Sequence, residues 1–177
     1  SLVMAREYER GTLESLFVTP VGSGEILTAK AATNFLLGMV SLAISMVFAA
    51  FVFDIPIRGS LLLLLAVSAL FLIVALGLGL VISTATKNQF LACQFAIMGT
   101  FMPALMLSGF LYDILNMPPA VRAVTYLIPA RYYVTLLQTL FLAGDIPSVI
   151  IPFCITLGVF AVVLMSIARL KAPKSLE

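Results

Sequence analysis

Histidine is absent from this 177-residue chain, and charged residues make up only 10% of it. Without histidine, its own residues cannot form an imidazole metal site, a Ser-His-Asp triad or a histidine proton relay. The formal net charge of +2 gives little support to nucleic-acid binding. The two cysteines, Cys93 and Cys154, lie in apolar stretches, where we expect inert thiols rather than a disulfide.

Charge is also missing over long stretches of the chain. No Asp, Glu, Lys or Arg occurs in residues 31–53, 59–86, 88–112 and 146–168. A helix needs roughly 20 apolar residues to cross a bilayer core that is about 30 Å thick. The pattern therefore predicts an all-α, polytopic α-helical membrane protein with transmembrane helices at about 26–52, 59–84, 89–111 and 147–168. A soluble protein would have to bury four helices that are apolar on every side, which disfavours that alternative.

The third predicted span is the most polar of the four. It contains Gln94, Thr100 and Pro103, and proline in a membrane helix frees a carbonyl group that neighbours must satisfy. We therefore expect a kink here, and we expect Gln94, Thr100, Pro103 and Met106 to line a substrate pathway. The alternative is that these side chains only pack against neighbouring helices.

Residues 113–145 do not form a fifth span in this interpretation. Asn116-Met-Pro-Pro119 is a helix-start signal, and Pro129 interrupts the helix that follows. The next apolar stretch, 132–144, reaches only about 20 Å at 1.5 Å per residue, which is too short to cross. We expect a broken helix pair that lies at the interface or dips into the membrane and returns.

Basic residues predict the orientation. With four spans both termini share one side, and that side carries Arg6, Arg10, Lys30, Lys87, Arg169, Lys171 and Lys174. The other side carries Arg58, Arg122 and Arg131. The positive-inside rule therefore places both termini in the cytoplasm and the broken helix pair outside. We interpret Arg122 and Arg131 as headgroup anchors rather than substrate ligands.

Two kinds of chemistry are missing from the sequence. No predicted span carries a charge in its middle, which counts against an ion-coupled transporter. No glycine-rich phosphate loop ending in Lys-Ser or Lys-Thr occurs, so any ATP must be bound by another polypeptide. We expect no catalytic residue, no metal site and no cofactor in this chain.

One segment near the start of the chain is more specific than composition. Residues 6–20 read Arg6-Glu-Tyr-Glu-Arg-Gly-Thr-Leu-Glu-Ser-Leu-Phe-Val-Thr-Pro20. This segment resembles the cytoplasmic loop motif of the type-2 ABC exporter permeases, R-E-x-E-x-G-T-L-E-x-L-x-V-T/S-P. The segment that follows the third span resembles the same family, because five short blocks occur in the family's order: Leu107-Ser-Gly-Phe110, Met117-Pro-Pro119, Tyr126-Leu-Ile-Pro129, Arg131-Tyr-Tyr133 and Leu142-Ala-Gly-Asp145.

The resemblance covers nearly the whole chain, with two departures. The family has six spans per subunit, so these four are expected to be the C-terminal portion of a permease, without its first two spans. Tyr112-Asp113 stands where family members often have a turn that contains proline.

The resemblance implies the transmembrane subunit of an ATP-driven exporter in a bacterial inner membrane. A coupling helix within residues 1–20 would dock on a separate nucleotide-binding subunit, which would hold ATP and Mg, and a second permease subunit would complete the pathway. The implied docking residues are Glu7, Glu9, Arg10, Gly11, Thr12, Leu13, Glu14, Leu16 and Phe17. The implied exterior gate consists of Met117, Pro118, Pro119, Pro129 and Tyr132. An ATP-independent transporter or channel, or a structural membrane protein, is the alternative.

Overall fold

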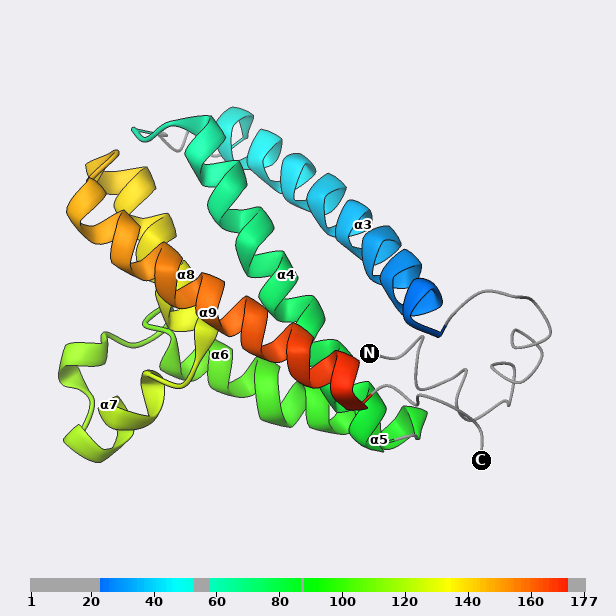
Figure 1. The fold of residues 1–177 in the computed structure, drawn as a ribbon. Coiled ribbons are helices and arrows are strands. Elements are labelled where there is room, and N and C mark those ends of the chain that lie inside the picture. Colours follow the sequence, from blue (N-terminus) through cyan, green and yellow to red (C-terminus); the bar gives the residue numbers. More distant parts are fainter. Residues whose placement is uncertain (1–22, 53–57, 87, 172–177) are drawn as a thin grey trace.

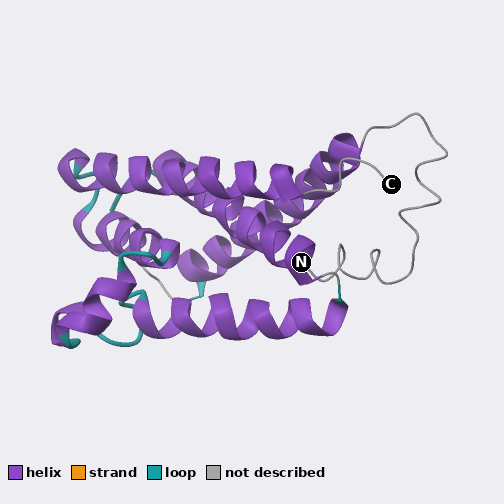
Figure 2. Cartoon of the chain, turned by 60° about the horizontal axis from the view of Figure 1, so that its bottom comes forward, coloured by secondary structure: helices purple, strands orange, loops and turns teal. Residues whose placement is uncertain are grey.

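The computed structural model describes residues 23–52, 58–86 and 88–171. These residues form helices joined by short loops and contain no strand (Figure 2). Four helical stretches are long and apolar enough to cross a membrane, namely Ala31–Ala49, Leu61–Thr86, Phe90–Leu107 and Pro147–Leu170. The prediction of a polytopic all-α membrane protein is confirmed.

Helix α4 (Leu61–Thr86) is the central element of the bundle. It packs against α3 (Ser23–Phe51) on one side and against α9 (Pro147–Lys171) on another. A Cβ atom added to Gly77 on α4 would lie 3.0 Å from the Cβ of Leu164 on α9. Glycine therefore lets these two helices approach closely, as small residues commonly do between membrane helices.

The third candidate span is built from three helical pieces. It consists of α5 (Gln89–Ala96), the π-helix η1 (Ile97–Phe101) and α6 (Met102–Leu107). The Asn88 side chain caps α5 by accepting hydrogen bonds from the backbone N–H groups of Phe90 and Leu91. The Met102 N–H donates to the Ile97 carbonyl, so the irregularity expected around Pro103 takes the form of a π-helix just before it.

Short helices follow the third span. The 3-10 helix η2 (Ile114–Asn116) and α7 (Pro119–Thr125) come first, and α8 (Pro129–Gln138) continues into the π-helix η3 (Thr139–Ala143). Both α7 and α8 begin with proline in the first turn. The helical structure is therefore interrupted between α7 and α8, just before Pro129.

The helix connections separate into two groups (Figure 1). The start of α3, the connection from α4 to α5 and the end of α9 lie at one end of the bundle. The end of α3, the start of α4 and the connection from η3 to α9 lie at the other end, which we call the loop end. This arrangement is the one expected of four spans whose termini share a side of the membrane.

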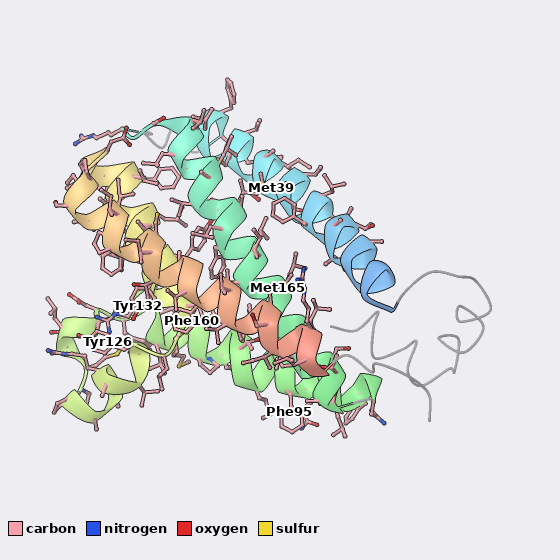
Figure 3. All side chains as sticks on the ribbon, viewed as in Figure 1. Met39, Phe95, Tyr126, Tyr132, Phe160 and Met165 are labelled. Atoms are coloured by element: carbon pink, nitrogen blue, oxygen red, sulfur yellow. The ribbon has the colours of Figure 1, made fainter. Side chains whose placement is uncertain are left out.

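The core lies where α4, α8 and α9 meet. Its buried residues are Leu64, Val67, Val74, Tyr132, Leu136, Leu140, Ile150, Leu157 and Ala161. The ring of Tyr132 packs at a tilt against Phe153 and Phe160, with centroid distances of 5.6 and 6.0 Å. Figure 3 shows Tyr132 beside Phe160, while Phe95 on α5 points away from the bundle. The outer faces of α3 and α5 are apolar and exposed, so they are available to lipid or to further helices.

Candidate functional site

An apolar cavity of about 470 Å³ lies between α4, the third span and the turn before α8. Ala75 and Gly79 line it from α4, Thr100 and Pro103 line it from the third span, and residues 127–130 close it from the turn. Pockets of about 300–1,000 Å³ with mainly apolar walls are the usual size for small-molecule sites. The cavity is therefore the candidate small-molecule site among the described residues.

Small residues explain why this space is open. Ala75 and Gly79 lie one turn apart on α4, and both belong to the cavity wall. Gly99 faces the cavity from the π-helix, and an added Cβ atom there would meet no atom within 4 Å. Two helices that present little side-chain volume to each other cannot fill the space between them.

The broken helix pair is held against α4 by a polar contact and a ring contact. The hydroxyl oxygens of Ser68 and Tyr133 lie 3.0 Å apart, and the Tyr133 ring stacks on Phe71 with a centroid distance of 4.2 Å. Burial raises the pKa of the Tyr133 phenol, and the hydrogen bond with Ser68 lowers it in part. The phenol therefore stays protonated at neutral pH and keeps its hydrogen bond.

A second set of contacts, at the loop end, joins the connection before α4 to η3 and the residues after it. The Gly59 N–H donates to the Leu140 carbonyl at 2.8 Å, and the Ser60 N–H donates to Oδ1 of Asp145 at 2.9 Å. The Arg58 guanidinium donates to the Leu142 carbonyl at 3.2 Å. These bonds clip the connection before α4 to the end of η3, so α8 and η3 run alongside α4 from the loop end inward.

The turn between α7 and α8 holds a fixed arginine. The Arg131 guanidinium lies over the Tyr126 ring, 3.9 Å from its centroid, and Nη1 donates to the Thr125 hydroxyl. The Tyr132 hydroxyl donates to the Tyr126 carbonyl at 2.9 Å. These three contacts join Thr125 and Tyr126 to Arg131 and Tyr132, and so fix the turn that lines the cavity.

The predicted pathway residues fall into two groups. Thr100 and Pro103 belong to the cavity wall, and the Thr100 hydroxyl donates to the Ala96 carbonyl within the helix. Gln94 and Met106 are exposed on the outer face and do not line this cavity. The Gln94 amide donates to the sulfur of Met98, at 4.0 Å.

The predicted gate residues also lie in different surroundings. Pro129 belongs to the cavity wall, and Tyr132 is buried in the core beside it. Met117, Pro118 and Pro119 lie at the start of α7 and are not part of the cavity wall. The structure therefore brings Pro129 and Tyr132 close to Thr100 and Pro103, but not the Met117–Pro119 turn.

The predicted docking residues lie outside the residues that the structure describes. Glu7, Glu9, Arg10, Gly11, Thr12, Leu13, Glu14, Leu16 and Phe17 all precede Ser23, where the description begins. The sequence prediction for this segment stays a prediction.

Sequence reasoning missed the α4 side of the cavity. Ala75 and Gly79 were visible as a pair of small residues spaced by four, which indicates close helix packing. That spacing alone does not reveal that a π-helix opposite leaves a cavity instead of a contact. Tyr126 belongs to one of the blocks that resemble the permease family, but nothing in the sequence indicates that Thr125 and Tyr126 hold Arg131.

Comparison with known proteins identifies one family and several relatives. The sequence model of the family described as ABC-2 type transporter matches residues 1–142. The "Probable multidrug ABC transporter permease YbhS" of Escherichia coli (strain K12) is 47% identical over 177 residues, which cover 100% of this chain and 47% of that protein. The "Probable multidrug ABC transporter permease YbhR" of the same organism is 31% identical over 145 residues, or 80% of this chain and 38% of that protein.

A third relative extends the comparison. The "Inner membrane transport permease YhhJ" of Escherichia coli (strain K12) is 28% identical over 174 residues, which cover 98% of this chain and 46% of that protein. The chain thus spans about half the length, or less, of these relatives. No solved structure matches it significantly.

Proposed function

The chain belongs to the ABC-2 type transporter family, and from this we propose that it is part of the transmembrane subunit of an ATP-driven exporter. The observation that carries the proposal is the family match itself, because it runs through the charged segment 1–20 and the three helical spans that follow it. Two of the relatives are named as multidrug permeases, which makes efflux of small amphipathic compounds the working function.

In this proposal the chain does no covalent chemistry. A separate nucleotide-binding subunit holds ATP and Mg and hydrolyses the nucleotide, and the segment 1–20 docks on that subunit. The ATPase can shift the membrane helices only if it docks differently in its ATP-bound and ATP-free states. Its movement would then reach the cavity through α3 and α4, which follow the docking segment directly in the chain.

The cavity and the broken helix pair would form part of the pathway. Residues 127–130, at and just before the start of α8, close the cavity. At the other end, η3 and Asp145 are held to the connection before α4 by the bonds that Gly59 and Ser60 donate. Movement of α8 along α4 would open the cavity toward that end. A second permease subunit, covering the exposed faces of the spans, would complete the pathway in a bacterial inner membrane, with both termini in the cytoplasm.

Three substitutions in the docking segment test the proposal. In the full-length permease, Glu9→Ala, Glu14→Arg and Gly11→Leu should leave the membrane level unchanged, because exposed ion pairs stabilise a protein by only about 0–1 kcal/mol. Removing one side of a charge pair buried against a partner costs about 2–5 kcal/mol, which corresponds to roughly a 30- to 5,000-fold loss of binding. Co-purification of the ATPase and export should fall together.

A matched control uses a charge outside the motif. Lys174→Glu near the C-terminus changes the charge by as much as Glu14→Arg and should leave co-purification intact. Normal retention of the ATPase in all three motif variants would refute the proposed docking segment. ATPase activity that does not respond to the permease would favour an ATP-independent transporter instead.

A further inference from the structure

We propose that Arg131, together with Arg122 and Thr125, forms an anion-binding site beside the cavity that takes the phosphate or carboxylate headgroup of an amphiphile. The apolar part of the same amphiphile occupies the cavity. The inference rests on the proposed transport function and narrows it to anionic amphiphiles as ligands.

The position of Arg131 within the bundle is the first step. Arg131 follows Ala130, which lines the cavity together with Phe71 and Ile82 of α4. Phe71 lies eleven residues beyond Ser60 at the loop end, or about 17 Å along the helix at 1.5 Å per residue. A hydrocarbon core is about 30 Å thick, so Arg131 lies well below the loop end of the bundle. An arginine at membrane depth costs at least about 2.5 kcal/mol and commonly marks a ligand pathway.

The guanidinium of Arg131 is fixed and still has free donors. It lies on the Tyr126 ring and donates from Nη1 to the Thr125 hydroxyl. Arginine has five N–H donors in a planar fork, and among the described residues this bond is the one that Arg131 donates. The remaining donors suit bidentate binding of a phosphate or carboxylate.

Arg122 lies in the last turn of α7, just before this turn. The Thr125 hydroxyl donates to the backbone carbonyl of Arg122 at 2.8 Å and accepts from the side chain of Arg131, so Thr125 links the α7 backbone at Arg122 to the Arg131 guanidinium. Arg122 donates from Nη2 to the Leu115 carbonyl at 2.8 Å, and its Nε is buried with no hydrogen-bond partner among the described residues. A buried donor without a partner is costly, so an unfilled acceptor position is expected near it.

No carboxylate of the described chain neutralises these charges. The two acidic side chains that the structure places are Asp113, which accepts from the Leu115 N–H at 3.0 Å, and Asp145, which accepts from the Ser60 N–H. Neither arginine has a carboxylate oxygen within 4.0 Å among the described residues. Charged groups away from water need a counter-ion. Residues 127–130, which directly precede Arg131, line the apolar cavity, and this indicates a counter-ion that carries an apolar body.

Photolabelling with matched probes tests the site. The full-length permease and its ATPase subunit are placed in phosphatidylcholine nanodiscs with an alkyl phosphate that bears a diazirine in its chain, or with the alcohol of the same chain. The phosphate should label the cavity peptides at a mole fraction at least about 10-fold lower than the alcohol does, because charged hydrogen bonds favour the anion. Equal labelling by the two probes would overturn the proposal, and this comparison needs no substitution.

Substitutions test whether Arg131 causes the preference for the phosphate probe. Arg131→Gln should abolish the difference between the probes, and Arg131→Lys should keep part of it because the charge remains. Arg169→Gln, which removes the same charge at the far end of α9, should keep all of it. A preference for the phosphate that survives Arg131→Gln would contradict the assignment.

Competition separates the two sources of the anion. Displacement of the probe by added phosphatidylglycerol assigns the site to a lipid headgroup, whereas displacement by unlabelled alkyl phosphate alone assigns it to a transported amphiphile. Displacement by neither would overturn the site. Stimulation of the ATPase is measured in the same nanodiscs. A permease that does not stimulate its ATPase contradicts the proposed function, whereas the preference for the phosphate probe tests the anion site alone.

Discussion

Ser68 on α4 and Tyr133 on α8 share a hydrogen bond with their oxygens 3.0 Å apart. Ser68 is fully buried, and the ring of Tyr133 stacks on Phe71 one turn further along α4. A polar pair in an apolar interior fixes position more strictly than apolar packing does, because only one register of the two helices satisfies both hydroxyls. This pair sets how α8 lies along α4 and therefore where the turn with Arg131 meets the cavity.

The coupling between these two hydroxyls can be measured. Ser68→Ala and Tyr133→Phe should each lower thermal stability in detergent, and Tyr133→Phe keeps the ring contact with Phe71. A double-mutant cycle should give a coupling of about 0.6 kcal/mol, the average for hydrogen bonds in membrane proteins, and at most about 1.7 kcal/mol. Tyr112→Phe serves as control, since that side chain is exposed. Additive effects of the first two substitutions would contradict the pairing.

A substitution at Gly59 tests the clip at the loop end. A Cβ atom there would lie 2.9 Å from the Leu140 carbonyl oxygen and 3.0 Å from Oδ1 of Asp145. Gly59→Ala should therefore push the two connections apart and destabilise the protein by about 1–3 kcal/mol. Gly158→Ala on α9 is the matched control, because an added Cβ would meet no atom within 4 Å. Equal melting temperatures for the two variants would rule out the clip.

Filling the cavity should impair transport without disturbing the ATPase. Ala104 lines the cavity, so Ala104→Trp places a large ring in the space proposed for the substrate. We expect export to fall at least about 10-fold, which corresponds to about 1.4 kcal/mol, while ATPase co-purification stays normal. Gly158→Trp adds the same ring where an added Cβ has open space and should have little effect. Full export by the Ala104 variant would exclude the cavity from the pathway.

The orientation of the bundle can be checked by cysteine labelling in intact cells. Cys93 and Cys154 are replaced first, because both are free thiols. An impermeant reagent added outside should label cysteines at positions 58 and 116, and should label a cysteine at position 87 only after permeabilisation. The basis is the positive-inside count and the separation of helix connections into two ends (Figure 1). Labelling of position 87 from outside would reverse the assignment.

The spans could be predicted from the sequence because their signal is local. An uncharged run such as residues 59–86 marks α4 (Leu61–Thr86), since each residue of a membrane helix must be apolar or bonded within the bundle. Pro129 likewise marks the start of α8, because proline lacks the N–H that a helix interior needs. These features depend on neighbours within a few residues.

The interior of the site could not be predicted, because it depends on contacts between distant segments. The sequence interpretation made Arg131 a headgroup anchor, and nothing local shows that α8 runs inward along α4. That course follows from the contacts of Tyr133 with Ser68 and Phe71 and of Leu140 with Gly59. Similarly, Pro103 predicted a kink but not the π-helix Ile97–Phe101. A π-helix contains one more residue per turn, and in a run of apolar residues this extra residue does not change the sequence pattern.

The central claim is that residues 1–20 couple a separate ATPase to this membrane domain, and site-directed crosslinking tests it most directly. A cysteine at position 14 in a cysteine-free full-length permease is joined to the purified ATPase subunit by a short bifunctional reagent, with a cysteine at position 116 as control. We predict an adduct at position 14 whose yield changes when ATP is added, and none at position 116. An ATPase that binds the permease but forms no adduct at position 14, or forms one at position 116, would contradict the account.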